Sequence, residues 1–273
     1  MKNKILIYDD NCPLCSWYSG EFVRFGFLPE DGRKAFSSLD PSLLAKIDFE
    51  KSRNEIPLLD MATGKVLYGI DALLEILDPK IPFIKTTGNI PVVKWFLGKF
   101  YKLISYNRKV IVAKKCGPAS IDCAPDMNYF YRFIFMTVFL LFNSIMLFPL
   151  HDHILTTLSY YNLSLVELQS SHFVFVLINC ALAFTLSKVK GFEYLGQVNM
   201  LAFTAILLLI PLLILNLFYV NEWVNTFYLV FTASFIFKEY IRRMDFAGVL
   251  LNNKWLAGIN LLTLTGFLFY LFD

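Results

Sequence analysis

Residues 4–15, KILIYDDNCPLC, decide the fold of the first part of the chain. Residues 4–8 form an apolar run with β-branched side chains, which predicts a buried strand, and residues 16–25 favour a helix. The pair Cys12 and Cys15 therefore falls where a strand ends and a helix begins. Unpaired amides and the helix dipole at such a position lower the pKa of a cysteine. We expect Cys12 to be the exposed nucleophile and Cys15, one turn inward, to be the resolving thiol.

Composition divides the chain into a soluble and a membrane part. The 273 residues are 56% hydrophobic and 17% charged, which is too apolar for a soluble globular protein. The long uncharged runs lie almost entirely after residue 132. We expect an α/β domain over 1–80, an amphipathic helix with a cysteine-containing loop over 81–128, and an all-α transmembrane bundle over 129–273. The net charge of +3 and the lack of a long basic run argue against a nucleic-acid partner.

The order of elements in the first domain follows from apolar periodicity and turn residues. After the first strand and helix we expect a strand over 33–39 and a short helix over 41–47. A hairpin follows, with strands over 55–61 and 65–69, and then a helix over 70–77. The predicted order is β-α-β-α-β-β-α.

This order resembles the thioredoxin fold, because Cys-x-x-Cys opens the first helix and Ile-Pro opens the hairpin. The resemblance implies that Pro57 forms a cis peptide bond beside the thiols and supplies a wall for the substrate backbone. The alternative is a proline at the first residue of an edge strand, where its missing N–H is tolerated.

A narrower resemblance links two separate stretches to the DCC thiol-disulfide oxidoreductase family. Residues 8–15 contain a D-x-x-C-x-x-C pattern, and residues 100–108 resemble the family's Tyr…Asn-Arg block, with Asn107 and Arg108 at its end. The resemblance covers residues 5 to about 125 and implies disulfide exchange. Asp9 matches the acidic position and either relays a proton or caps the turn.

One departure from the family pattern is Asp10, which stands where the family usually has glycine. Without glycine, the backbone of this turn is more restricted. The added negative charge would oppose thiolate formation at Cys12.

The remaining cysteines leave several alternatives open. Cys116 and Cys123 could form a second exchangeable thiol pair, favoured by the neighbouring Lys114 and Lys115, or be ordinary loop thiols. The four thiols of the first part could instead hold zinc. Cys180 lies alone in an apolar segment, where a cysteine is usually a small packing residue.

Five apolar segments predict five membrane spans, over 133–150, 172–187, 196–220, 222–238 and 255–272. Lysine and arginine occur in alternate connections, which places the N-terminal domain in the cytoplasm and the C-terminus outside a plasma membrane. Asparagines scattered through the spans are expected to hydrogen-bond between helices. Residues 91–104 predict an amphipathic helix that either lies on an anionic membrane face or packs on the soluble domain.

Three histidines fall near the predicted outer face. His151 and His153 follow the first span, and His172 opens the second. Their imidazoles could bind a metal, a haem or a quinone head group, or simply face solvent.

The sequence as a whole predicts a membrane-anchored thiol-disulfide oxidoreductase with a redox-active disulfide and no other cofactor. Its partners would be membrane lipid and a disulfide-containing protein or small thiol. The alternatives are a non-catalytic protein whose head docks a partner or binds zinc, and a quinone-linked redox membrane protein.

Overall fold

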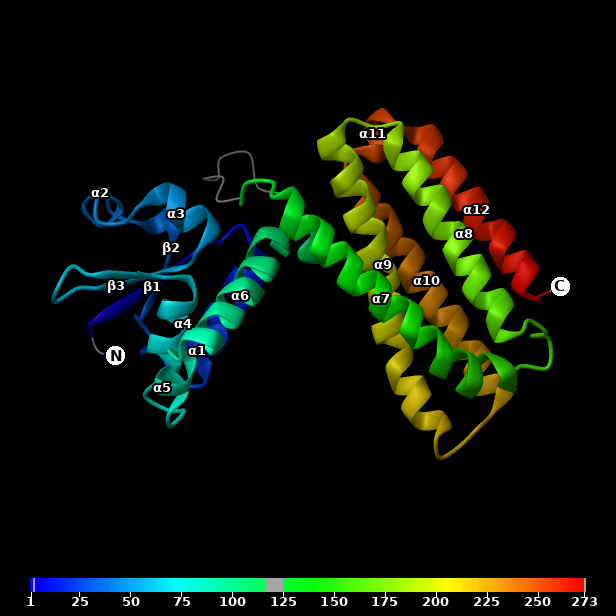
Figure 1. The fold of residues 1–273 in the computed structure, drawn as a ribbon, viewed down its shortest axis with the longest axis horizontal. Helices are drawn as coiled ribbons and strands as arrows, with labels where there is room; N and C mark the ends of the chain where they lie inside the picture. Colours follow the sequence, from blue (N-terminus) through cyan, green and yellow to red (C-terminus); the bar gives the residue numbers. More distant parts are fainter. Residues whose placement is uncertain (2, 116–124, 273) are drawn as a thin grey trace. The chain divides into compact units, whose positions relative to one another are not determined.

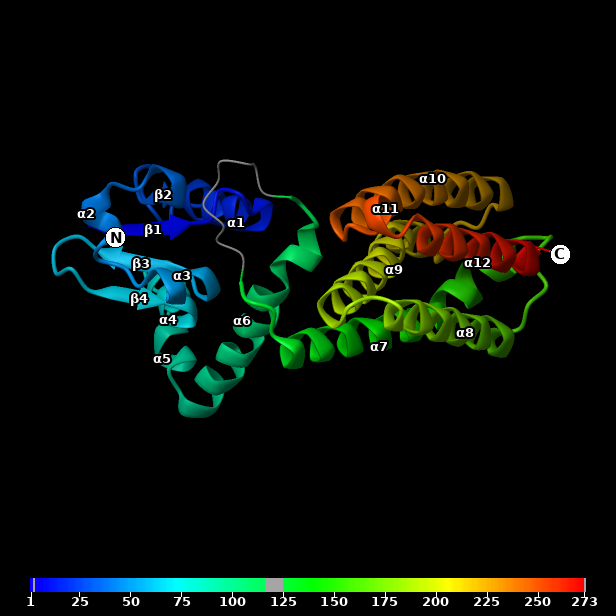
Figure 2. The same cartoon turned by 90° about the horizontal axis from the view of Figure 1, so that it is seen from above.

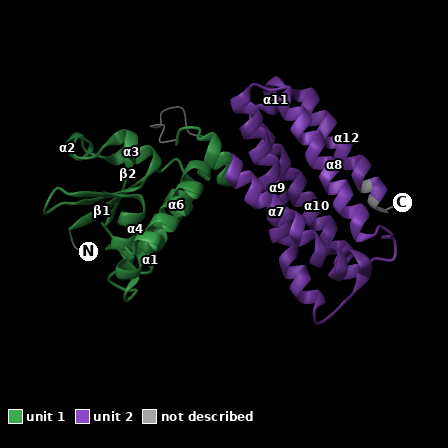
Figure 3. Cartoon of the chain, viewed as in Figure 1, with its two compact units in different colours: residues 1–132 green, residues 133–273 purple. Residues whose placement is uncertain are grey.

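The computed structural model describes residue 1, residues 3–115 and residues 125–272. The chain divides into two compact units, Met1–Arg132 and Phe133–Asp273 (Figure 3). We describe each unit by itself.

Unit 1 is built on a four-stranded mixed sheet with the order β2-β1-β3-β4 (Figure 2). Strand β1 pairs in parallel with β2 and antiparallel with β3, which in turn pairs antiparallel with β4. The strands are β1 (Lys4–Tyr8), β2 (Arg33–Ala35), β3 (Pro57–Asp60) and β4 (Val66–Tyr68).

The element order of unit 1 follows the predicted one, with three differences, one of which is the unpredicted short helix α5. The second strand ends at Ala35, because Phe36–Ser38 form the 3-10 turn η1. The unpredicted helix α3 begins where the Asp48 side chain accepts a hydrogen bond from the Lys51 amide at 3.0 Å. The helices are α1 (Pro13–Arg24), α2 (Pro41–Leu44), α3 (Phe49–Asn54), α4 (Gly69–Leu77), α5 (Ile84–Gly88) and α6 (Pro91–Val112).

Both faces of the sheet are covered, because successive side chains of a strand point to opposite faces. Leu6 and Leu58 lie in one apolar cluster, which includes residues of α1 and α4. Ile7 and Leu59 lie in another, which includes Phe36 and Leu43 of α2. The prediction of a buried first strand is therefore confirmed, and the sheet is the middle of three layers (Figure 1).

Unit 2 is helical, and α7 leads into it. Among the residues that the structure describes, three segments are long and apolar enough to cross a membrane: Tyr129–Thr157, Leu165–Phe184 and Lys188–Asn216. The other two predicted spans fall on α10 and α12. The elements are α7 (Tyr129–His153), η2 (Leu155–Thr157), α8 (Leu165–Phe184), α9 (Lys188–Asn216), α10 (Glu222–Phe246), α11 (Val249–Asn252) and α12 (Lys254–Phe272).

The predicted start of the second span at residue 172 is wrong. Helix α8 begins at Leu165, because Ser164 and Glu167 form a capping box in which each side chain bonds the other's backbone amide. His172 therefore lies two turns inside α8 and does not open it.

Asparagine side chains hydrogen-bond between the elements of unit 2, as predicted. Asn179 Oδ1 on α8 accepts bonds from Tyr194 Oη on α9 and from Asn260 Nδ2 on α12, both at 2.5 Å. Further inter-element bonds join Asn143 to Asn199, Asn199 to the Met136 carbonyl, Asn216 to the His153 carbonyl, and Asn225 to Thr157.

Candidate active site

The Cys-x-x-Cys pair lies at the N-terminus of α1, as predicted. Cys12 is the N-cap residue, with φ −97° and ψ 107°, and its Sγ accepts a hydrogen bond from the Cys15 amide at 3.4 Å. Pro13 follows at the first helical position, where a missing N–H costs nothing. Both cysteines are free thiols.

Cys12 is more enclosed than predicted. Its exposed fraction is 9% and that of Cys15 is 3%, so the expectation of an exposed nucleophile is wrong, although Cys15 is the deeper of the two. Asp9 and Arg108, which lie beside the pair, are equally buried, at 8% and 9%. The junction between a buried strand and a packed helix has little surface left for the thiol.

The two thiols have pKa values displaced in opposite directions. A hydrogen bond with the Cys15 side chain lowers the pKa of Cys12 to about 7, against the opposing influence of burial. The same hydrogen bond, together with burial, raises the pKa of Cys15 well above its ordinary value. At neutral pH, Cys12 therefore has substantial thiolate character while Cys15 keeps its proton.

Asp9 shapes the turn before the helix. Its Oδ1 accepts the Asn11 amide at 3.0 Å, and its backbone carbonyl accepts the Cys12 amide at 3.2 Å. This is the predicted capping role. Burial raises the pKa of the Asp9 carboxyl, and the Arg108 charge opposes that rise.

Asp10 is hydrogen-bonded outside this turn, although, besides burial, its charge contributes to the raised pKa of Asp9. Its Oδ2 accepts a hydrogen bond from the Ser37 hydroxyl at 2.8 Å. The carboxylate whose charge raises the pKa of Cys12 is that of Asp9.

Arg108 connects the thiols to the acidic turn from a distant part of the chain. Its Nη1 lies 3.8 Å from Cys15 Sγ, and its Nη2 lies 3.4 Å from Asp9 Oδ2. The guanidinium charge lowers the pKa of both cysteines. In the sequence, Arg108 is notable only as part of the block that resembles the family. In the structure, its side chain contacts Cys15 and Asp9.

One face of α6 holds the segment that leads into β3. Tyr101 Oη accepts the Ile56 amide at 2.8 Å, and Ser105 Oγ donates to the Asn54 carbonyl at 2.5 Å. Arg108 Nη2 donates to the Arg53 carbonyl at 3.1 Å. The three helix residues follow an i, i+4, i+7 spacing, which places them on one face.

Asn107, the other predicted motif residue, does not contact the thiols. Its Nδ2 donates to the carbonyls of Leu103 and Tyr131, at 2.8 and 3.2 Å. It ties the end of α6 to the first residues of α7 within unit 1.

Pro57 does not have the predicted cis peptide bond. No cis bond occurs among the described residues, and both Ile56 and Pro57 belong to them. Pro57 opens β3 opposite Tyr68 of β4, at the first residue of a strand. The trans form, which is the cheaper one for an X-Pro bond, fits this position without distortion.

Asp9, Cys12 and Cys15 could offer ligands to a metal ion, because their ligand atoms all lie within 4.8 Å of one another. The Arg108 guanidinium already brings a positive charge to Asp9 and Cys15, which disfavours a second cation. Cys116 and Cys123 lie outside the described residues. The four-thiol zinc site and the second thiol pair therefore remain predictions.

The three histidines do not assemble into a ligand set among the residues that the structure describes. The ring nitrogens of His151 contact Asp152 Oδ1 at 2.7 Å and the Leu163 carbonyl at 3.3 Å. The predicted grouping fails because His172 is displaced into the interior of α8.

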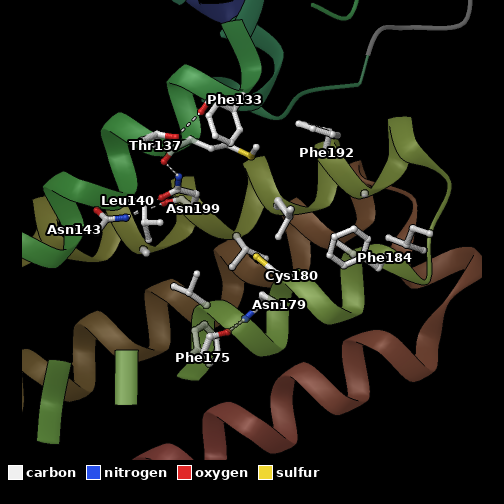
Figure 4. Close-up of a pocket in the computed structure, with 18 of the residues that line it drawn as sticks. Phe133, Thr137, Leu140, Asn143, Phe175, Asn179, Cys180, Phe184, Phe192 and Asn199 are labelled. Atoms are coloured by element: carbon white, nitrogen blue, oxygen red, sulfur yellow. Dashed lines mark hydrogen bonds between the residues drawn. The ribbon is translucent and has the colours of Figure 1, made fainter. Parts of the chain in front are cut away.

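A mainly apolar cavity of about 590 Å³ lies between α7, α8 and α9 (Figure 4). Its lining includes Cys180, His172 and the hydrogen-bonded pair Asn143 and Asn199. His151 and His153 are not among the lining residues. The quinone alternative needs the three histidines around one cavity, and His172 alone among them lines this one.

No protein-family model, curated protein or solved structure matches the chain. The function must therefore be argued from the chemistry of the site itself.

Proposed function

We propose that the protein is a membrane-anchored thiol-disulfide oxidoreductase whose thiol site works on the cytoplasmic side. The observation that carries the proposal is the state of Cys12, a helix N-cap thiol with a pKa of about 7 beside a protonated Cys15. A nucleophilic thiolate next to a resolving thiol is the arrangement that disulfide exchange requires.

In the first step, the Cys12 thiolate attacks one sulfur of a substrate disulfide. A mixed disulfide forms between Cys12 and that sulfur, and the other substrate sulfur leaves as a thiolate that takes up a proton. Cys12 then no longer bears the charge that raises the pKa of Cys15.

In the second step, Cys15 loses its proton and attacks Cys12 Sγ. The Cys12–Cys15 disulfide forms, and the second substrate sulfur leaves as a thiolate. Arg108 stabilises the Cys15 thiolate, and Asp9, whose pKa is raised by burial, fits the role of proton acceptor. The substrate gains two electrons, and a dithiol or small thiol restores the reduced enzyme.

The family resemblance supports the same proposal. The D-x-x-C-x-x-C pattern and the Asn-Arg block resemble those of the DCC thiol-disulfide oxidoreductase family. Arg108, from the distant block, lies beside Cys15 and Asp9, as expected if the two stretches form one site.

Alkylation of Cys12 as a function of pH tests the proposal directly. The rate, followed by mass spectrometry of the protein in detergent, should rise with pH to a plateau with a midpoint near 7. Below that midpoint it should fall about tenfold per pH unit, because the thiol becomes protonated. Cys15 should stay unreactive over the same range, because its pKa is raised and it is buried.

Two variants connect this reactivity to exchange. Cys15→Ser should accumulate mixed disulfides with a disulfide-containing substrate, whereas Cys12→Ser should neither form them nor turn over. Normal turnover by the Cys12→Ser protein would refute the mechanism. Stoichiometric zinc in the purified protein, with Cys12 unreactive until unfolding, would favour the zinc-binding alternative instead.

A further inference from the structure

Helix α6 carries a row of exposed apolar side chains opposite its packed face. Val92, Trp95, Phe96 and Phe100, which we call the α6 stripe, have exposed fractions of 76%, 64%, 62% and 55%. Their i, i+3, i+4, i+8 spacing places them on one side of the helix. A contiguous exposed patch of large apolar groups marks an interaction surface.

The charge of α6 indicates the kind of surface that covers the stripe. The helix contains four lysines, one arginine and no acidic residue. Three of these cations form ion pairs with acidic residues of unit 1, which are Lys94–Asp71, Lys102–Glu55 and Arg108–Asp9. Lys99 lies within the stripe, with its Nζ 5.9 Å from the centre of the Trp95 ring. Aromatic side chains mixed with lysines are typical of helices that lie in the headgroup region of anionic membranes.

The chain itself keeps α6 near a membrane. Helix α6 ends at Val112, and the membrane-length segment that includes α7 begins at Tyr129. Even a fully extended connection of this length spans at most about 60 Å. Membrane insertion of α7 would therefore hold the stripe at a high local concentration beside the bilayer.

We propose that α6 lies along the surface of an anionic bilayer, with the α6 stripe buried among the lipid headgroups. The opposite face, with Tyr101, Ser105 and Arg108, stays packed on unit 1. The two alternatives predicted for this helix, binding to a membrane and packing on the soluble domain, then both apply, one to each face of the helix. This inference does not depend on the proposed chemistry.

Two tryptophans of equal exposure provide a matched test. The chain has four tryptophans, and Trp17 on α1 has the same exposed fraction, 64%, as Trp95. We would prepare full-length proteins that keep only Trp95 or only Trp17, with the other tryptophans replaced by phenylalanine. Both would be placed in nanodiscs of phosphatidylcholine and phosphatidylglycerol, with or without bromine on the acyl chains near the headgroup.

Brominated lipid should quench Trp95 and leave Trp17 bright, whereas aqueous acrylamide should quench Trp17 several-fold more strongly. Adding Phe96→Glu and Phe100→Glu to the Trp95-only protein should restore acrylamide access. An unchanged Cys12 alkylation rate would show that unit 1 remains folded.

Equal acrylamide quenching of both tryptophans, without bromine quenching, would overturn the proposal, because the stripe would then face water. Protection of Trp95 from both quenchers would overturn it as well, because protein would cover the stripe. Loss of bromine quenching when phosphatidylglycerol is omitted would support the role assigned to the lysines.

Discussion

The site separates two chemically identical thiols by giving them different hydrogen-bonding roles. Cys12 Sγ accepts from the Cys15 amide and side chain, so its thiolate is favoured, while burial and the donated bond keep Cys15 protonated. A difference of one turn in a helix is enough to produce this division. It assigns the attacking and resolving roles that exchange requires.

Arg108 should set both the reactivity and the stability of this site. We expect Arg108→Met to raise the pKa of Cys12, because a cation that lowers it is removed. The midpoint of the alkylation profile should therefore move to higher pH. Arg108→Lys, which keeps the charge, should move it less.

The same substitution leaves the buried Asp9 without its ion-pair partner. We expect Arg108→Met to lower the free energy of unfolding by about 3 kcal/mol at neutral pH. The loss should shrink as the pH falls, because Asp9, whose pKa is already raised, can then take up a proton. Thermal unfolding between pH 5 and 8 measures this; a pH-independent loss would show that Asp9 is not the group affected.

At the residue scale, local sequence predicts the thiols and the acidic turn but not their neutralising partner. Cys12, Cys15 and Asp9 are close in the chain, and the helix N-terminus explains their chemistry. Arg108 is 93 residues beyond Cys15, and only the packing of α6 on unit 1 brings it there. Composition and periodicity contain no information on that contact.

At the element scale, α6 holds the loop before β3 through Tyr101, which accepts the amide of the buried Ile56. Tyr101→Phe should leave this amide without its acceptor and lower the free energy of unfolding by about 1–2 kcal/mol. Thermal unfolding followed by circular dichroism measures the change.

Tyr106→Phe is the matched control on the same helix. Tyr106 contributes a ring stacked on Tyr131, with centroids 5.2 Å apart, and phenylalanine keeps that stack. We expect its stability to stay within about 0.5 kcal/mol of the parent protein. Equal effects of the two substitutions would argue that the Tyr101 hydroxyl contributes nothing specific.

Asn179 should fix the packing of three helices, because its Oδ1 accepts from both Tyr194 and Asn260. Asn179→Ala leaves two buried donors without this acceptor. We expect a loss of about 1 kcal/mol, because two hydrogen bonds are removed and each contributes about 0.6 kcal/mol on average between membrane helices. Asn162→Ala, at an exposed position before α8, is the control and should change the free energy of unfolding little. If both substitutions lowered the free energy of unfolding equally, the effect would not be specific to the hydrogen bonds of Asn179.

Element boundaries depend on caps more than on hydropathy. The start of α8 is fixed by Ser164 and Glu167, a polar pair outside the apolar run, so an apolar window places it seven residues too late. The asparagine contacts between helices were predictable, because buried amides in hydrocarbon need partners. Which partners they bond depends on helix register, and the sequence does not specify it.

At the scale of the whole chain, the ends of unit 2 differ in charge. The α8–α9 and α10–α12 connections lie at one end, where Leu182, Tyr194, Tyr240 and Leu256 share a cluster. The α7–α8 and α9–α10 connections lie at the other, where Glu222 accepts bonds from Ser159. Lysines and arginines flank the first two connections (Lys188, Lys190, Arg242, Arg243 and Lys254), whereas residues 151–171 and 217–221 contain none.

This segregation is the pattern expected of five crossings. Among the residues that the structure describes, three segments are long and apolar enough to cross a membrane. Both three and five crossings put the C-terminus opposite unit 1, so the termini cannot distinguish them. The connection between α10 and α12 can, because it lies on the same side of the membrane as unit 1 with five crossings and on the opposite side with three.

Single cysteines at the connections should therefore decide the topology. We expect an impermeant maleimide to label Asn162→Cys in intact cells, and Ser187→Cys and Asn252→Cys only after permeabilisation. The parent protein is the control, since its own cysteines should stay unlabelled in intact cells if unit 1 is cytoplasmic. Labelling of both Asn162→Cys and Asn252→Cys in intact cells would indicate three crossings. Labelling of Ser187→Cys but not Asn162→Cys would reverse the orientation, and the thiol site would then work in the oxidising compartment.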